Sequence, residues 1–144
     1  MATSKPSAGY SGTPLAKKLG VKAGHRVALI GAPPGFVDCL AGLPEEVTIC
    51  NSLRGKQVCD VIVFFARSEE ELTAKFLNLA ERLSTAGGLW IAWPKKASGV
   101  QTDVSEGVVR AIGLSSRLVD NKVCAIDETW SGLRFVRRLA DRAD

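Results

Sequence analysis

The sequence of 144 residues is poor in the side chains that hold metal ions. It has one histidine, His25, and four cysteines, Cys39, Cys50, Cys59 and Cys124. No two of these cysteines are spaced as C-x-x-C. A zinc site would need all four thiolates to converge from separate segments. Each cysteine lies in or beside an apolar run, where a thiol packs as a small apolar group. We therefore expect no metal site, and reduced thiols.

Membrane and export signals are also missing. The longest uncharged run, residues 83–94, is too short and too polar to span a bilayer. The N-terminal stretch has a lysine but no apolar segment of the kind found in secretory signals. We expect a cytoplasmic protein without membrane contact. Residues 1–8 are predicted to be a disordered lead-in, and residues 9–144 a single domain.

Motifs that bind nucleotide phosphates are absent as well. The stretch "GAPPGF", residues 31–36, occupies the place of the dinucleotide motif G-x-G-x-x-G, but Pro33 stands at the second glycine and Pro34 follows. Prolines have no N–H to offer a phosphate. The ATP motif G-x-x-x-x-G-K-[ST] and the hydrolase motif G-x-S-x-G are missing too. NAD, FAD and ATP are poor candidates, and no catalytic residue is predicted.

What the sequence does contain is an alternation of strand and helix patterns. Apolar runs predict strands at residues 25–31, 46–51, 58–66 and 89–93. Helices are predicted at four places. The first begins at Pro14 with Thr13 as cap, and the second lies within residues 33–42. The third begins at Ser68 with a Ser-x-x-Glu capping box, and Gly87-Gly88 ends that unit; the fourth runs from Thr102 or Asp103 to Gly113.

Residues 122–127 and 133–139 flank a five-residue loop, "ETWSG", and predict an antiparallel hairpin. The whole pattern predicts an α/β fold. We expect a Rossmann-like, mainly parallel sheet with helices on both faces and a C-terminal antiparallel hairpin. Along the strand "LWIAW", alternation places Leu89, Ile91 and Trp93 on one face and Trp90 and Ala92 on the other.

Two resemblances agree with this fold. "KKLGVKAGHRVALIGAPPGF" and "LSTAGGLWIAW" resemble the first helix–strand unit and a later helix–strand segment of methyltransferase-type Rossmann proteins. "GYSGTPLAKKLG", "WIAWPKK" and "KVCAIDETWSGLRFVRR" together resemble a bacterial family catalogued only as a domain of unknown function. That second resemblance implies a small Rossmann-like protein, and it brings no established activity or catalytic residues.

In such a sheet, ligands bind beyond the carboxyl ends of the parallel strands. Loops 31–36, 50–54, 65–68 and 93–97 are expected there, and His25 at the opposite end. S-adenosylmethionine has no phosphate, so the prolines oppose it less, and Gly31 and Gly35 permit close backbone approach. Asn51 stands where methyltransferases usually carry the acidic residue for the ribose hydroxyls, and it bonds them less strongly. Residues 31–36 therefore look like a degenerate cofactor loop. We expect no bound cofactor, and S-adenosylmethionine is the one cofactor that this loop would allow.

Two further places are candidate contacts. Lys95 and Lys96 follow Pro94 at the predicted crevice edge, where they meet an anion or are simply solvated. Trp130 is predicted in the hairpin turn, where it either folds back onto the sheet edge or stands exposed with Arg134 as a partner contact. A net charge of +4 permits nucleic acid as a partner without indicating it.

The sequence thus leaves two functions open. The main interpretation is a small binding or interaction protein on a methyltransferase-type scaffold, contacting a protein partner or another copy of itself. The alternative is an S-adenosylmethionine-dependent methyltransferase or a derivative of one.

Overall fold

The computed structural model describes residues 14–40, 42–53 and 57–142. The predicted lead-in and the cap at Thr13 lie outside these residues. The elements are, in chain order, α1 (Leu15–Lys18), β1 (Arg26–Ile30), the 3-10 helix η1 (Phe36–Cys39), β2 (Thr48–Cys50), β3 (Cys59–Phe65), α2 (Glu69–Glu81), β4 (Leu83–Pro94), η2 (Lys96–Ser98), α3 (Glu106–Leu114), β5 (Leu118–Ala125), β6 (Trp130–Arg137) and η3 (Leu139–Arg142).

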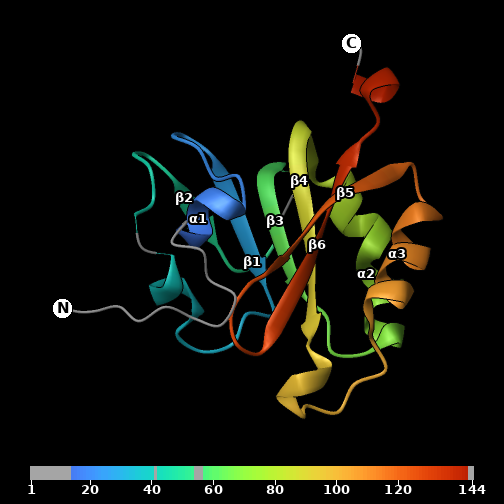
Figure 1. Ribbon diagram of the computed structural model, residues 1–144. Coiled ribbons are helices and arrows are strands. Elements are labelled where there is room, and N and C mark those ends of the chain that lie inside the picture. Colours follow the sequence, from blue (N-terminus) through green and yellow to red (C-terminus); the bar gives the residue numbers. More distant parts are fainter. Residues whose placement is uncertain (1–13, 41, 54–56, 143–144) are drawn as a thin grey trace.

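The strands form one six-stranded sheet in the order β2-β1-β3-β4-β6-β5 (Figure 1). Strands β2, β1, β3 and β4 run parallel, and β6 is antiparallel to both β4 and β5. This confirms the predicted fold. After β1 the chain goes outward to β2 and then returns to the other side of β1 to form β3. The topological switch point, where α/β sheets bind ligands, is therefore between β1 and β3.

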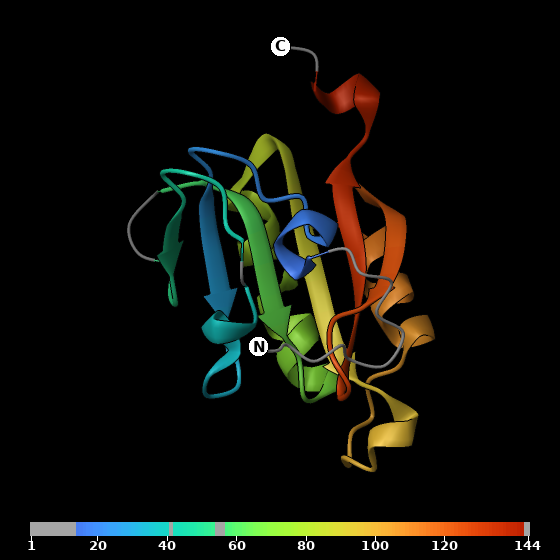
Figure 2. The same cartoon turned by 60° about the vertical axis from the view of Figure 1, so that its left-hand side comes forward.

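Helices cover the sheet on both faces, as predicted (Figure 2). Helices α2 and α3 pack on one face, in a core that includes Leu89, Ile91 and Trp93. The other face is covered by α1 and η1, which are only four residues each, and its core includes Trp90 and Ala92. The predicted alternation along β4 is thus confirmed. No helix of the described residues is long and apolar enough to cross a membrane.

One hydrogen bond attaches α1 to the sheet. The indole N–H of Trp90 donates to the backbone carbonyl of Leu19, the residue that ends α1, over 3.1 Å. Both residues are completely buried. A four-residue helix has little stability of its own, so tertiary contacts such as this one must stabilise it.

The helix beginnings agree with the prediction in one case and not in the other. The Ser68 hydroxyl accepts the Glu71 N–H at the start of α2, as the capping box predicts. Helix α3 begins later than predicted, with Ser105 as its cap. Thr102 instead donates its hydroxyl to the Arg67 carbonyl, and the Asp103 carboxylate accepts the Glu69 N–H. The predicted caps of α3 are wrong because these side chains bind the start of α2 and the loop before it.

The Gly87-Gly88 pair lies inside β4, so the prediction that it ends a helical unit is wrong. A Cβ on Gly87 would lie 2.6 Å from the Asp60 carbonyl, and a Cβ on Gly88 would collide with the Arg134 side chain. The two glycines therefore allow a close approach within the sheet rather than a turn.

The hairpin is confirmed, but its turn is earlier than predicted. Trp130, Ser131 and Gly132 belong to β6 and pair with β4, and Ser131 and Gly132 also pair with β5. The Asp127 carboxylate accepts the N–H groups of Thr129 and Trp130, both at 2.8 Å. This local bonding closes the turn before Trp130.

Candidate functional site

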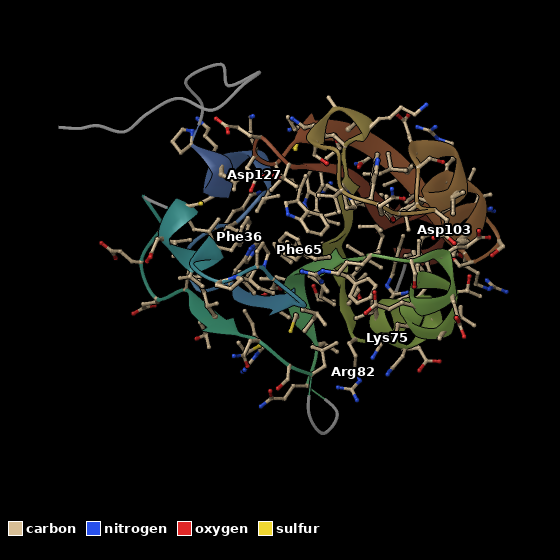
Figure 3. The ribbon with its side chains drawn as sticks, turned by 90° about the horizontal axis from the view of Figure 1, so that it is seen from below. Phe36, Phe65, Lys75, Arg82, Asp103 and Asp127 are labelled. Atoms are coloured by element: carbon tan, nitrogen blue, oxygen red, sulfur yellow. The ribbon has the colours of Figure 1, made fainter. Side chains whose placement is uncertain are left out.

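A hollow of about 620 Å³ lies beyond the carboxyl ends of β1 and β2. Figure 3 views the molecule from this end of the sheet. Its volume falls within the range of about 300–1,000 Å³ that small-molecule sites occupy. We call it the β1–β2 hollow. It is lined by Leu29, Gly31, Ala32, Pro33, Gly35, Phe36, Val37, Ile49, Cys50 and Asn51. The structure therefore brings together the three predicted cofactor residues Gly31, Gly35 and Asn51.

The two glycines of the first loop differ in what confines them. Both have a left-handed backbone, with φ of 74° at Gly31 and 79° at Gly35. A Cβ on Gly31 would lie 3.3 Å from the Phe65 carbonyl, which leaves little room for a side chain. A Cβ on Gly35 would meet nothing within 4 Å. Gly35 is thus required by backbone conformation alone, and a larger residue there would project into open space at the hollow.

The loop offers few donors for a phosphate. Pro33 and Pro34 have no N–H, and the Phe36 N–H donates to the Pro33 carbonyl over 3.1 Å. Within residues 33–36 only the Gly35 N–H remains for a ligand. A pyrophosphate site needs several such donors. The two prolines therefore argue against a dinucleotide in the structure as they do in the sequence.

The lining is otherwise apolar. Leu29, Phe36, Val37 and Ile49 contribute apolar surface, and none of the described residues that line the hollow is charged. The Cys50 thiol donates to the Val27 carbonyl at 3.5 Å, so it is directed at the sheet. Asn51 is exposed and supplies an amide that both donates and accepts. This set suits a flat, apolar ring attached to a hydroxylated sugar better than it suits a charged group.

Arg67 is the residue of this region that sequence reasoning missed. Its Nη1 donates to the carbonyls of Gly31, at 3.0 Å, and Phe65, at 3.3 Å. It therefore spans the carboxyl ends of β1 and β3 at the switch point. Its guanidinium carbon lies 5.2 Å from the centre of the Trp130 ring. The sequence offers one signal that could have indicated Arg67: it is a charged residue in the loop 65–68, directly after a strand predicted to be buried.

Trp130 is buried, with only 6% of its surface exposed. Its ring meets Phe65 edge-on at 5.1 Å between ring centres, and Phe65 meets Phe36 at 4.9 Å. Figure 3 shows Phe36 and Phe65 next to each other. Of the two predicted placements, folding onto the sheet is right, and the exposed partner contact is wrong. Phe36, Phe65 and Trp130 thus belong to one core, which lies below the carboxyl ends of the parallel strands. Arg134 lies opposite Trp90 instead, half-buried beside Gly88.

A second hollow of about 490 Å³ lies at the carboxyl end of β4. We call it the β4 hollow. Lys96 lines it, whereas Lys95 does not and donates its backbone N–H to the Thr129 carbonyl. Its lining residues are Trp93, Pro94, Lys96, Gly99, Val100, Gln101, Thr102, Asp103, Val104, Ser105 and Glu106. The bond from Thr102 to the Arg67 carbonyl places Arg67 beside both hollows.

The described residues give little support for a metal site or for a nucleophilic cysteine. The described residues contain no group of three or more His, Cys, Asp or Glu that could hold a metal. Burial raises the pKa of Cys59 to about 11, with a further contribution from Cys50, and burial also raises the pKa of Cys124. Such thiols stay protonated and are poor nucleophiles at neutral pH. His25 precedes β1, away from both hollows, and its Nδ1 accepts the Lys22 N–H.

No protein-family model and no curated protein sequence matches the chain, so its resemblance to the uncharacterised bacterial family stays a prediction. Solved structures do match. An S-adenosylmethionine-dependent methyltransferase from Aquifex aeolicus has a TM-score of 0.58 at 17% identity, over 84% of this chain and 86% of that one.

The magnesium protoporphyrin IX methyltransferase of Synechocystis, with S-adenosylmethionine bound, has a TM-score of 0.59 at 13% identity, over 86% and 74% of the two chains. Fibrillarin from Aeropyrum pernix, also with S-adenosylmethionine, has a TM-score of 0.58 at 14% identity, over 89% and 70%. Likeness at this identity establishes the fold. The chain has the methyltransferase-type Rossmann fold that its sequence predicts.

Proposed function

We propose that this protein binds S-adenosylmethionine in the β1–β2 hollow and acts as a methyltransferase, or as a derivative that keeps the cofactor site. The observation that carries the proposal is the hollow itself. It lies beyond the carboxyl ends of β1 and β2, beside the switch point, and Gly31, Gly35 and Asn51 line it. The fold shared with methyltransferases supports the proposal. This likeness favours the alternative drawn from the sequence over the binding-protein interpretation.

The residues present fit this cofactor in three respects. Gly31 and Gly35 let a ligand approach the backbone, and the apolar residues suit an adenine ring. The Asn51 amide can bond a ribose hydroxyl as donor or acceptor. No N–H donors for a phosphate are needed, because S-adenosylmethionine carries no phosphate. When bound, S-adenosylmethionine supplies a methyl group to a nucleophilic acceptor.

The contribution of the chain to such a reaction is binding and orientation. Holding two reactants in the correct geometry accounts for a large part of many rate enhancements. The β4 hollow provides space for an acceptor at the same end of the sheet. No base from the chain is needed for an acceptor that loses its proton to solvent.

Calorimetric titration with S-adenosylmethionine and S-adenosylhomocysteine tests the proposal. We expect a Kd on the order of micromolar, which corresponds to about −8 kcal/mol. The variant Gly35→Leu should weaken binding about ten-fold or more, because the leucine side chain fills part of the hollow. Gly24→Leu is the matched control, since Gly24 has φ of 77° and equally open surroundings but lies before β1. No heat with either ligand at millimolar concentration would refute the proposal.

The binding-protein interpretation remains the second candidate. It is favoured by the two prolines of the first loop and by Asn51 in the place of a carboxylate. A protein that binds the cofactor without methyl transfer, and that sediments as an oligomer or with a protein partner, would fit it. Binding of nucleic acid through Lys95 and Lys96 would require affinity that falls steeply with salt.

A further inference from the structure

The Arg67 guanidinium is fixed at one end and open at the other. A guanidinium has five N–H donors. Its Nη1 is occupied by the carbonyls of Gly31 and Phe65, while Nε and Nη2 have no partner among the described residues. One face of the group stacks on Trp130. The position is therefore held by two hydrogen bonds and a ring contact, and three N–H donors remain.

The remaining donors have the geometry of an oxyanion site. Nε and Nη2 share one edge of the planar group, and their N–H bonds are parallel, which matches two oxygens of a carboxylate or phosphate. Because Nη1 points at the ends of β1 and β3, this edge faces away from those carbonyls. A fixed guanidinium loses less conformational entropy on binding than a mobile one does.

Arg67 is exposed, and no carboxylate of the described residues forms an ion pair with it. Glu71 is near, but its Oε1 accepts the backbone N–H of Arg67 rather than a guanidinium N–H. The Asp103 carboxylate accepts the Glu69 N–H. A cation at the switch point that has no carboxylate partner among the described residues favours an anionic group on a ligand.

We propose that Arg67 is an anion-binding residue of the crevice and takes a carboxylate or phosphate of a small molecule through its Nε and Nη2 edge. It contacts Gly31, which lines the β1–β2 hollow, and its carbonyl accepts the hydroxyl of Thr102, which lines the β4 hollow. Arg67 therefore lies between lining residues of the two hollows. This inference stands whether or not the protein binds S-adenosylmethionine.

The experiment uses the tryptophan under Arg67 as the reporter. The full-length protein is titrated with inorganic phosphate, and separately with acetate, at neutral pH and constant ionic strength, and its intrinsic fluorescence is followed. Neutralising a cation stacked on the Trp130 ring changes the electrostatic environment of that ring. We expect a saturable change at millimolar anion. The Trp130→Phe variant should lose the change, which assigns the signal to that ring.

Two charge variants decide the outcome. Arg67→Gln should weaken phosphate binding about ten-fold or more, since two charge-assisted bonds are lost, and Arg67→Lys should weaken it less. Lys75→Gln is the control, because it removes one positive charge from the exposed side of α2, outside both hollows, and it should bind as the wild type does. Each variant is first checked for native circular dichroism. Unchanged phosphate binding in Arg67→Gln, or no saturable change in the wild type, would overturn the inference.

A last arm identifies the source of the anion. The phosphate titration is repeated with saturating S-adenosylhomocysteine. Competition would mean that the carboxylate of that ligand occupies Arg67, and simultaneous binding would mean that Arg67 serves a second, anionic small molecule. If S-adenosylhomocysteine does not bind, the proposed function fails, while the phosphate titration alone still decides the role of Arg67.

Discussion

The substitution Trp90→Phe tests how the short helix α1 is held on the sheet. The Trp90 indole donates to the Leu19 carbonyl over 3.1 Å, and both residues are fully buried. Phenylalanine has no donor, and a buried carbonyl without its partner costs about 1–3 kcal/mol. The smaller ring leaves a cavity of roughly 40 Å³, which adds about 1 kcal/mol at about 24 cal/mol per Å³. We expect the free energy of unfolding to fall by about 2–4 kcal/mol.

The control is Trp93→Phe in the same strand. Trp93 packs on the opposite face, and its indole N–H makes no hydrogen bond with the described residues. It should lose only the cavity contribution, about 1 kcal/mol. Urea unfolding measures both variants, and the slope with denaturant must stay constant for the comparison to hold. Equal losses in the two variants would refute the contribution of the bond to Leu19.

Two other predictions concern stability. Gly113→Ala should destabilise the protein by about 1–3 kcal/mol, because a Cβ there collides with the Phe135 ring. Gly107→Ala in the same helix meets only the Ser105 hydroxyl oxygen at 3.9 Å and should stabilise it by up to about 1 kcal/mol, and thermal unfolding that gave both the same sign would contradict this. The folded-state pKa of Cys59, about 11, lies above that of an unfolded thiol, about 8.5, so stability should fall as pH rises through this window. Urea midpoints should fall less steeply with pH in Cys59→Ala than in the wild type.

The fold was predictable from the sequence because its signals are local. β3 is apolar except for Asp60, which is the pattern of a parallel strand buried on both faces. The capping box of α2 and the alternation in β4 are readable in the same way. The failures have one cause. Gly87-Gly88 and the caps of α3 were assigned by local rules, whereas contacts with Asp60, Arg134 and the start of α2 determine their structure.

The candidate site was predictable only in part. Gly31, Gly35 and Asn51 follow strands, and parallel strands bring their carboxyl ends to one edge. Trp130 and Arg67 could not be placed in this way, because they meet only when β6 pairs antiparallel with β4. No local pattern in the sequence encodes that contact between positions far apart in the chain.

The central claim is that the β1–β2 hollow binds the cofactor. The most direct measurement is a nitrogen–proton NMR titration of the isotope-labelled protein with S-adenosylhomocysteine. The account predicts saturable shifts of the Gly31, Gly35 and Asn51 backbone amides, with Gly24 at the opposite end of the sheet unchanged. Shifts confined to other parts of the chain, or none at millimolar ligand, would contradict it.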